Sequence, residues 1–189
     1  MNSIIRFDTE LFMLVNTRLT APFLDSFMPY VTDKLNFLGA IIISAVLIWV
    51  LGKRRDRAGL VTLVLLVLAS DLFCNQLKHL FMRIRPCHAI EGVRVLAGCG
   101  GSYSMPSGHA TNIFAAMVFL TARYKRLFPL FLSIAFIVAY SRVYVGVHYP
   151  SDVIAGAGLG TVMALLFTKA EGLILSRYLD KKEEDQVEL

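Results

Sequence analysis

The sequence predicts an all-α membrane protein, a polytopic bundle of about six helices formed by residues 1–189 as a single domain. Of its 189 residues 56% are hydrophobic, which exceeds the apolar share of an ordinary soluble domain. The apolar residues gather in blocks that are mostly apolar all round, whereas a soluble bundle needs amphipathic helices. Each block reaches the roughly 20 residues that cross a bilayer only with its polar flanks. The blocks cover residues 37–51, 59–69, 110–122, 127–140 and 153–168.

The two ends of the chain have a different pattern. Residues 1–20 place apolar side chains at helical spacing among charged ones, without the basic start and cleavage site of a secretory signal peptide. We expect an amphipathic helix that either lies in the membrane interface or packs as a first, polar-ended span, and we favour contact with the bundle. Residues 176–189 mix basic and acidic side chains, which predicts a solvated cytoplasmic tail.

Two short basic segments predict the orientation in the membrane. Segments 53–57 and 123–126 are rich in Lys and Arg, and short basic loops favour the cytoplasm. Two spans separate these segments, so both fall on the same side, and the connections 83–106 and 141–152 then face outward. The basic residues lie at helix ends rather than on one soluble face, which argues against a nucleic-acid partner.

The first polar cluster closes the helix expected at 59–82. Lys78 and Arg85 are seven residues apart, a spacing that places two side chains on one helical face. Pro86 disfavours helix at Arg85 and helps to end the segment. Two fixed cations, one of them the planar fork of an arginine, suit a phosphate. The alternative is that both side chains only snorkel to the interface.

The second cluster, Pro106-Ser107-Gly108-His109, predicts the start of a helix. Free backbone N–H groups at such a start, together with the helix dipole, favour an anion. Ser107 adds a hydroxyl donor, Gly108 permits close approach, and His109 is placed to deliver a proton. An ordinary capped helix with an incidental histidine is the alternative.

The third cluster places Arg142, His148 and Asp152 between the last two spans. Pro150 suits the first turn of the final helix, so Asp152 lies near that start. There its carboxylate can accept a hydrogen bond from one imidazole nitrogen of His148 and leave the other nitrogen free to attack. The alternative is a simple helix cap beside an exposed histidine.

Together the three clusters predict one metal-free phosphoryl-transfer site on the outward side. We expect His148 to attack phosphorus in line, Asp152 to orient it, and His109 to protonate the leaving group and then activate water. Phosphoryl transfer mainly requires positioning and charge stabilisation. No group of Asp, Glu and His resembles a divalent-metal cage, so no metal or other cofactor is expected. The residues expected to bind the phosphate are Lys78, Arg85, Ser107, Gly108 and Arg142.

These clusters resemble the signature motifs of the type 2 phosphatidic acid phosphatase (PAP2) superfamily. KHLFMRIRP, PSGH and SRVYVGVHYPSD match K-x6-R-P, P-S-G-H and S-R-x5-H-x3-D in spacing and order over residues 78–152. The resemblance, to the integral-membrane branch, implies a six-helix bundle, a phosphohistidine intermediate and a lipid phosphate or diphosphate as the partner. The short loops of this chain suit a multi-pass enzyme of a bacterial inner membrane, with its site facing the periplasm or the exterior.

The resemblance leaves the lipid open. An outward-facing site favours undecaprenyl diphosphate or the lipid A 1-phosphate, and phosphatidylglycerol phosphate and phosphatidic acid are the alternatives. Two other functions compete with hydrolysis: transfer of the phosphate from His148 to another lipid, and anion binding by a transporter or scaffold without catalysis.

The outer connection carries further candidates. Cys87 and Cys99 both lie there, and a disulfide between them is a hypothesis for an oxidising compartment. Cys74 lies within a span and is expected to pack. Three side chains of the connection are candidates for selecting the head group: His88, Glu91 and Arg94.

Overall fold

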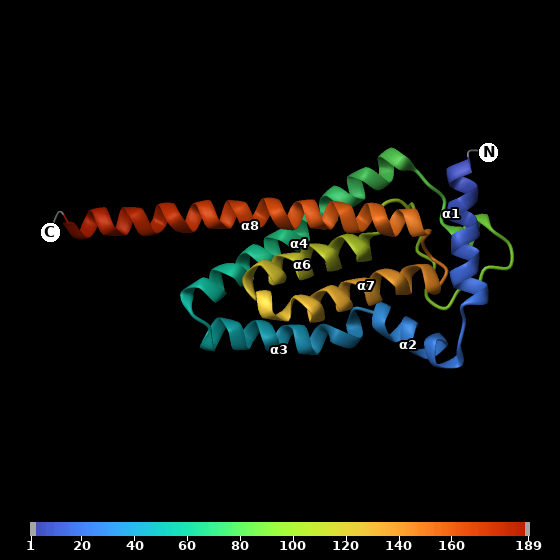
Figure 1. Ribbon diagram of the computed structural model, residues 1–189, viewed down its shortest axis with the longest axis horizontal. Helices are drawn as coiled ribbons and strands as arrows, with labels where there is room; N and C mark the ends of the chain where they lie inside the picture. The colour runs from blue at the N-terminus through green and yellow to red at the C-terminus, as the bar shows by residue number, and fades with distance from the viewer. Residues whose placement is uncertain (1–2, 188–189) are drawn as a thin grey trace.

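A computed structural model describes residues 3–187, and within that range the protein is helical with no strand, as predicted. The one-turn α5 and two short turns, η1 and η2, join longer helices (Figure 1). The helices are α1 (Ser3–Met13), η1 (Leu14–Arg18), α2 (Pro22–Thr32), α3 (Leu35–Leu51), α4 (Arg54–Phe81), α5 (Pro86–Ala89), α6 (Gly108–Arg123), η2 (Lys125–Leu127), α7 (Phe128–Tyr144) and α8 (Pro150–Val187).

Three stretches are long and apolar enough to cross a membrane, Arg54–Ala89, Lys125–Tyr144 and Pro150–Ser176. Helices α2 and α3 meet at a bend of 48° and add a fourth span if they are counted as one. None of the residues of α3 is buried, as expected of an apolar helix that faces lipid. The tail predicted from residue 176 continues as helix to Val187, and residues 188 and 189 lie outside the described part.

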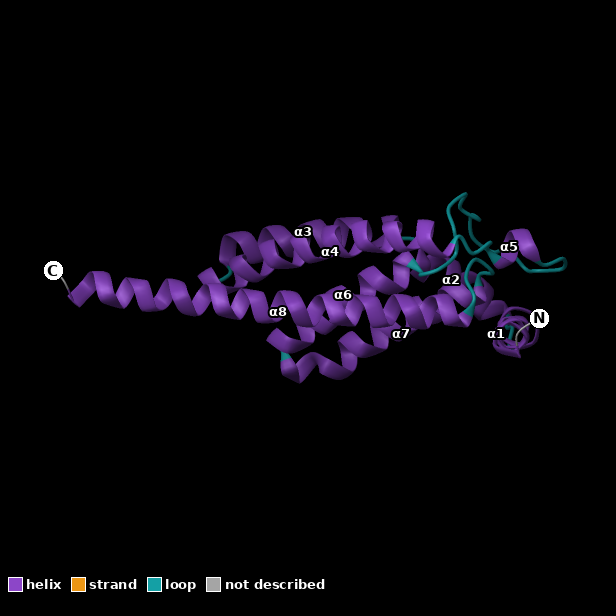
Figure 2. Ribbon diagram, turned by 90° about the horizontal axis from the view of Figure 1, so that it is seen from above, coloured by secondary structure: helices purple, strands orange, loops and turns teal. Residues whose placement is uncertain are grey.

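Helix α1 lies crosswise over one end of the bundle, and Figure 2 shows it end-on. Its inner face carries Asp8 and Phe12, which are buried, whereas Ile5 and Phe7 are 48% and 67% exposed. The Phe12 ring packs on Tyr149 with ring centroids 5.5 Å apart. Of the two expectations for residues 1–20, the structure supports a helix packed across the end of the bundle rather than a span.

Small residues let α6 and α8 pack closely. A Cβ atom on Gly156 would lie 2.5 Å from the carbonyl oxygen of Ser107, and one on Gly160 would collide with the carbonyl of Thr111. Glycines one turn apart permit such an approach between helices. Because Ser107 immediately precedes α6, the contact at Gly156 fixes the start of α6 against the start of α8, where two of the polar motifs lie.

The two basic segments meet at the other end of the bundle. The guanidinium of Arg123 donates to the carbonyl of Arg55, and the Tyr124 hydroxyl donates to Asp56 Oδ1 at 3.1 Å. The segments predicted to share one side of the membrane therefore share one end of the structure. Helix α4 already begins at Arg54, because Asp56 caps its first turn. Most of segment 53–57 is therefore a helical turn rather than a loop.

Candidate active site

The three polar motifs meet at the end of the bundle that α1 covers. The motifs lie where α4 and α7 end and where α6 and α8 begin, and these ends are brought together by the packing of α6 on its neighbours. Six of the side chains predicted to act there are buried, which is unusual for charged groups unless they have partners. They are Lys78, Arg85, Ser107, Arg142, His148 and Asp152.

Lys78 and Arg85 converge, although not in the way the spacing suggested. Helix α4 ends at Phe81, and Met82 takes a left-handed conformation with φ 45°. The prediction that both cations share one helical face is wrong, because this turn breaks the helix before Arg85. Both side chains instead reach Ser102: Arg85 Nη2 donates to Ser102 Oγ at 2.9 Å, and Lys78 Nζ lies 3.5 Å from the same oxygen.

Arg85 also reaches the imidazole of His148. Its Nε donates to the carbonyl of Ser102 at 2.7 Å and its Nη1 to the carbonyl of Val147 at 3.3 Å. The same Nη1 lies 3.2 Å from His148 Nε2. A guanidinium beside Nε2 fits a ring whose Nε2 carries the lone pair, which is the tautomer that a nucleophile requires.

Asp152 holds the opposite side of the ring. It is fully buried, and its Oδ2 lies 3.5 Å from His148 Nδ1. The same oxygen accepts the N–H of Tyr149 at 2.9 Å and the hydroxyl of Ser104. Helix α8 begins at Pro150, so its first turn places the carboxylate beneath the ring. His148 is only 2% exposed, which excludes the alternative of an exposed histidine beside a simple cap.

The start of α6 supplies two more of the predicted groups. Ser107 precedes the helix, and its N–H donates to the carbonyl of Asp152 at 2.9 Å. A Cβ atom on Gly108 would lie 3.9 Å from Lys78 Nζ, so this backbone lines the space around the ammonium. His109 occupies the first turn.

His109 and Arg142 complete the cluster. His109 is close enough to Arg142, His148 and Lys78 to interact with each of them electrostatically. Arg142 lies in the last turn of α7, where its Nη1 donates to the hydroxyl of Thr32. Its carbonyl accepts the N–H of His148 at 3.2 Å, so the cation and the imidazole belong to one tight turn.

Several groups of this cluster lack a protein partner. Among residues 3 and 5–176, Ser107 Oγ and Arg142 Nε are buried without a hydrogen bond. In the same range the three cations Lys78, Arg85 and Arg142 form no salt bridge. Buried unpaired donors and cations cost free energy, and an anion would supply what they lack. The cluster therefore has the donors and the charge of a phosphate site.

Comparison with known proteins decides the family. The sequence profile of the PAP2 superfamily matches residues 59–173. A lipid A 4'-phosphatase of Porphyromonas gingivalis is 30% identical over 95% of this chain and 79% of its own. The chain belongs to the PAP2 superfamily. It is a membrane lipid phosphatase of that superfamily, as the three motifs predicted.

Other PAP2 proteins show how widely the resemblance extends. An undecaprenyl-diphosphatase of Sulfolobus acidocaldarius is 33% identical over 88% of this chain and 80% of its own. The crystal structure of Aquifex aeolicus LpxE matches with a TM-score of 0.74 at 26% identity, covering 86% of this chain and 95% of that one. A Bacillus subtilis phosphatidylglycerolphosphate phosphatase shares the fold, with a TM-score of 0.74 at 23% identity over 92% of this chain and 89% of that one.

Two residues of this PAP2 site escaped the sequence analysis. Arg83 binds Asp152 Oδ1 at 2.7 Å and Asp8 Oδ2 at 2.6 Å. A signal for Asp8 exists, because it shares the inner face of α1 with Phe12, four residues on, and a charge on an apolar face implies a buried partner. Arg83 had no such signal, since it lies inside a motif as an unspecified residue.

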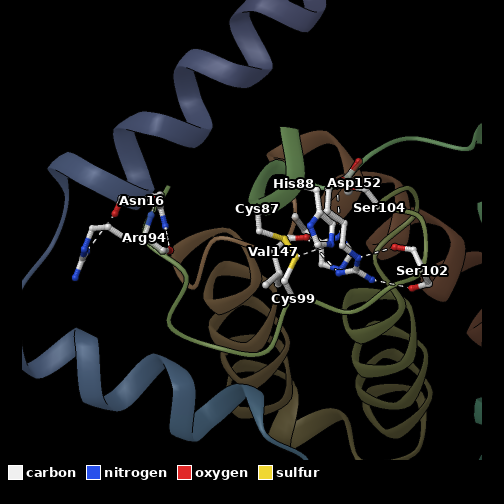
Figure 3. Close-up of a disulfide and its surroundings, with 11 residues drawn as sticks. Asn16, Cys87, His88, Arg94, Cys99, Ser102, Ser104, Val147 and Asp152 are labelled. Carbon is white, nitrogen blue, oxygen red and sulfur yellow. Dashed lines mark hydrogen bonds and ion pairs between the residues drawn. A yellow bond between two sulfur atoms is a disulfide. The ribbon is translucent and has the colours of Figure 1, made fainter. Parts of the chain in front are cut away.

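The outer connection is cross-linked and partly structural. The predicted Cys87–Cys99 disulfide is confirmed, and Figure 3 shows it beside His88. Arg94 was expected to help select the head group, but its Nη2 donates to Asp25 Oδ2 at 2.6 Å and its N–H to Asn16. This arginine therefore ties the connection to η1 and α2, away from the imidazole.

Acid is expected to destabilise the fold through His148. Burial lowers its pKa to about 4, and the charges of Arg85 and Arg142 act in the same direction. Between an ordinary histidine pKa of about 6.5 and that value, the unfolded chain binds a proton that the folded site refuses, so stability falls with pH. The loss amounts to about 2 kcal/mol between pH 7 and pH 4.5.

This effect can be isolated in a variant that lacks the titrating ring. Melting temperatures in detergent should fall more steeply with acid for the wild type than for His148→Gln, which cannot take up this proton. Parallel curves for the two proteins would contradict a neutral, buried imidazole in the folded state.

Proposed function

We propose that this PAP2 enzyme hydrolyses a lipid phosphate monoester or diphosphate through a phosphohistidine at His148. The observation that carries the proposal is the set of unpaired donors and cations around a buried, carboxylate-held imidazole. Such an arrangement suits an anion placed against Nε2, and phosphoryl transfer depends mainly on such placement and charge.

The residues divide the chemistry between two steps. In the first, His148 Nε2 bonds to phosphorus while the bond from phosphorus to the lipid oxygen breaks, and His109 gives that oxygen a proton. In the second, His109 takes a proton from water, the water oxygen bonds to phosphorus, and the bond from phosphorus to Nε2 breaks. Asp152 stabilises the imidazolium that forms between the steps. Lys78, Arg85, Ser107, Gly108 and Arg142 bind the nonbridging oxygens.

Two lipids are favoured as substrates, undecaprenyl diphosphate and a phosphate of lipid A. Relatives that cover most of this chain carry these names, one in Sulfolobus acidocaldarius and one in Porphyromonas gingivalis. The basic segments at the opposite end of the bundle support an orientation in which they face the cytoplasm of a bacterial inner membrane and the site faces outward. An outward site meets both lipids.

A panel of lipids assayed in EDTA tests this function. Purified protein should release inorganic phosphate from undecaprenyl diphosphate or from lipid A, faster than from phosphatidylglycerol phosphate or phosphatidic acid. The rate should be unchanged by EDTA, because cations of the chain itself are placed to bind the phosphate. Loss of activity in EDTA that Mg²⁺ restores would contradict the mechanism. If the phosphate were recovered on a second lipid rather than as inorganic phosphate, the phosphotransferase alternative would be favoured.

A further inference from the structure

Arg83 forms salt bridges with two carboxylates. Its Nη1 donates to Asp152 Oδ1 at 2.7 Å, and its Nη2 donates to Asp8 Oδ2 at 2.6 Å. One carboxylate begins α8 beside His148, and the other comes from α1, the helix that lies across this end of the bundle. The guanidinium thus joins the crosswise helix to the candidate active site.

The position of Arg83 is fixed on several sides. Its guanidinium stacks over the Tyr149 ring at 3.9 Å from the ring centroid. Its carbonyl accepts the N–H of Ser104, at 2.8 Å, and the hydroxyl of Ser104 donates to Asp152. A planar arginine fork in such a frame holds a carboxylate in a defined orientation, which a flexible lysine does less well.

Asp8 secures the outer side of this arrangement. Its carboxylate accepts the N–H of Ser151 at 2.9 Å and the Ser151 hydroxyl, in addition to the Arg83 bond. It therefore binds the first turn of α8 directly and through Arg83. The Asp8 and Asp152 side chains are 8% and 0% exposed. Two buried carboxylates without a cation between them would be strongly unfavourable.

The two oxygens of Asp152 have separate partners. Oδ1 accepts from Arg83, whereas Oδ2 lies toward His148 Nδ1. A carboxylate bound on one oxygen by a fixed cation cannot rotate or take up a proton easily, so its second oxygen stays directed at the imidazole. The partners that orient a reactive group are often as important as the group's own contacts.

We propose that Arg83, held by Asp8, is a positioning residue for the reaction, which keeps Asp152 ionised and oriented on His148. The inference rests on the proposed function, in which His148 is the nucleophile. It also gives α1 a purpose in catalysis, because the helix supplies the outer anchor of a chain of contacts from Asp8 through Arg83 and Asp152 to His148.

Substitutions in two backgrounds test the proposal. Arg83→Gln should lower kcat for phosphate release by roughly 10–100-fold, with KM changed by less than about 3-fold. Arg83→Lys, which retains the charge, should recover part of the loss, and Asp8→Asn should lose less than Arg83→Gln. In an Asp152→Asn background, Arg83→Gln should cost less than about 2-fold more, because the effect passes through Asp152.

The matched control is Arg123→Gln, which breaks a buried salt bridge to Glu171 at the other end of the bundle. It should lower the melting temperature and leave kcat unchanged. The proposal is overturned if folded Arg83→Gln keeps the wild-type kcat, if it loses as much in the Asp152→Asn background, or if Arg123→Gln loses as much activity. Should Arg83→Gln fail to fold, Arg83→Lys decides, because wild-type kcat in that variant would mean that the fork is not needed.

Failure of the proposed function would look different. In that case the wild type would release no phosphate from any lipid of the panel, or His148→Ala would release as much. The inference about Arg83 would then be judged with orthovanadate, a phosphate mimic, as the probe. Orthovanadate should raise the melting temperature of the wild type and raise that of Arg83→Gln less, and equal increases would overturn the inference.

Discussion

His148→Ala is expected to lower phosphate release by roughly 10⁴-fold or more, because it removes the atom that bonds to phosphorus. The groups nearest to the two nitrogens of the buried ring are the guanidinium of Arg85, which is not a nucleophile, and the carboxylate of Asp152, which lies on the side of Nδ1. The measurement is kcat for inorganic phosphate from the best lipid of the panel, with purified protein.

The control for this substitution is Arg126→Ala, which removes an exposed cation of η2 at the far end of the bundle. It should retain wild-type turnover. Full turnover by His148→Ala would mean that another group attacks phosphorus, and the phosphohistidine mechanism would be abandoned. A second measurement is the covalent label on the protein after a brief reaction with lipid radiolabelled in its phosphate. The wild type should carry an acid-labile label, and the variant should carry none.

The bundle itself could be predicted from the sequence because lipid imposes a simple requirement. A segment in a bilayer must satisfy its own backbone groups, so an apolar block of this length implies a helix. This rule does not predict the backbone conformation at the ends of the apolar blocks. Residues 82–85 lie outside the helix rather than adding about one more turn to α4, and only the left-handed Met82 reveals this. Nothing in the local pattern favoured that conformation for a methionine.

The motifs located the imidazole, the carboxylate and three cations, but they did not show what supports them. Asp8 and Arg83 are 75 residues apart along the chain and meet only because α1 lies across the bundle. Pairing of this kind depends on tertiary packing, which a single sequence does not reveal. The same applies to Arg94, whose charge suggested a ligand but is satisfied by Asp25.

The distribution of charge separates the two kinds of arginine at this end of the bundle. Arg83 and Arg94 have carboxylate partners, and their charges are compensated within the protein. Arg85 and Arg142 have none among residues 3 and 5–176, so their charge is available to an anion. The sequence motifs identify the arginines without a carboxylate partner, Arg85 and Arg142. The structure is needed to recognise that Arg83 and Arg94 are paired.

His109→Asn is expected to lower kcat/KM for a phosphate monoester by roughly 10²–10⁴-fold, the usual contribution of general acid catalysis. Its place in the first turn of α6, near His148 and Lys78, fits a group that protonates the leaving oxygen. A monoester expels an alkoxide, which is strongly basic and needs that proton. A diphosphate expels a phosphate ester, a far weaker base, so its first step should depend much less on His109.

This difference gives a test within one lipid tail. Phosphatidic acid and diacylglycerol diphosphate share the same diacylglycerol, so only the leaving group changes between them. The measured quantity is kcat/KM, because it reports the first irreversible step and not the later hydrolysis of the phosphohistidine. His109→Asn should lose at least 10-fold more on the monoester than on the diphosphate. Unchanged kcat/KM on both would mean that His109 acts only in the second step, as the base that activates water, and equal losses on both would mean that it does not act by protonating the leaving oxygen.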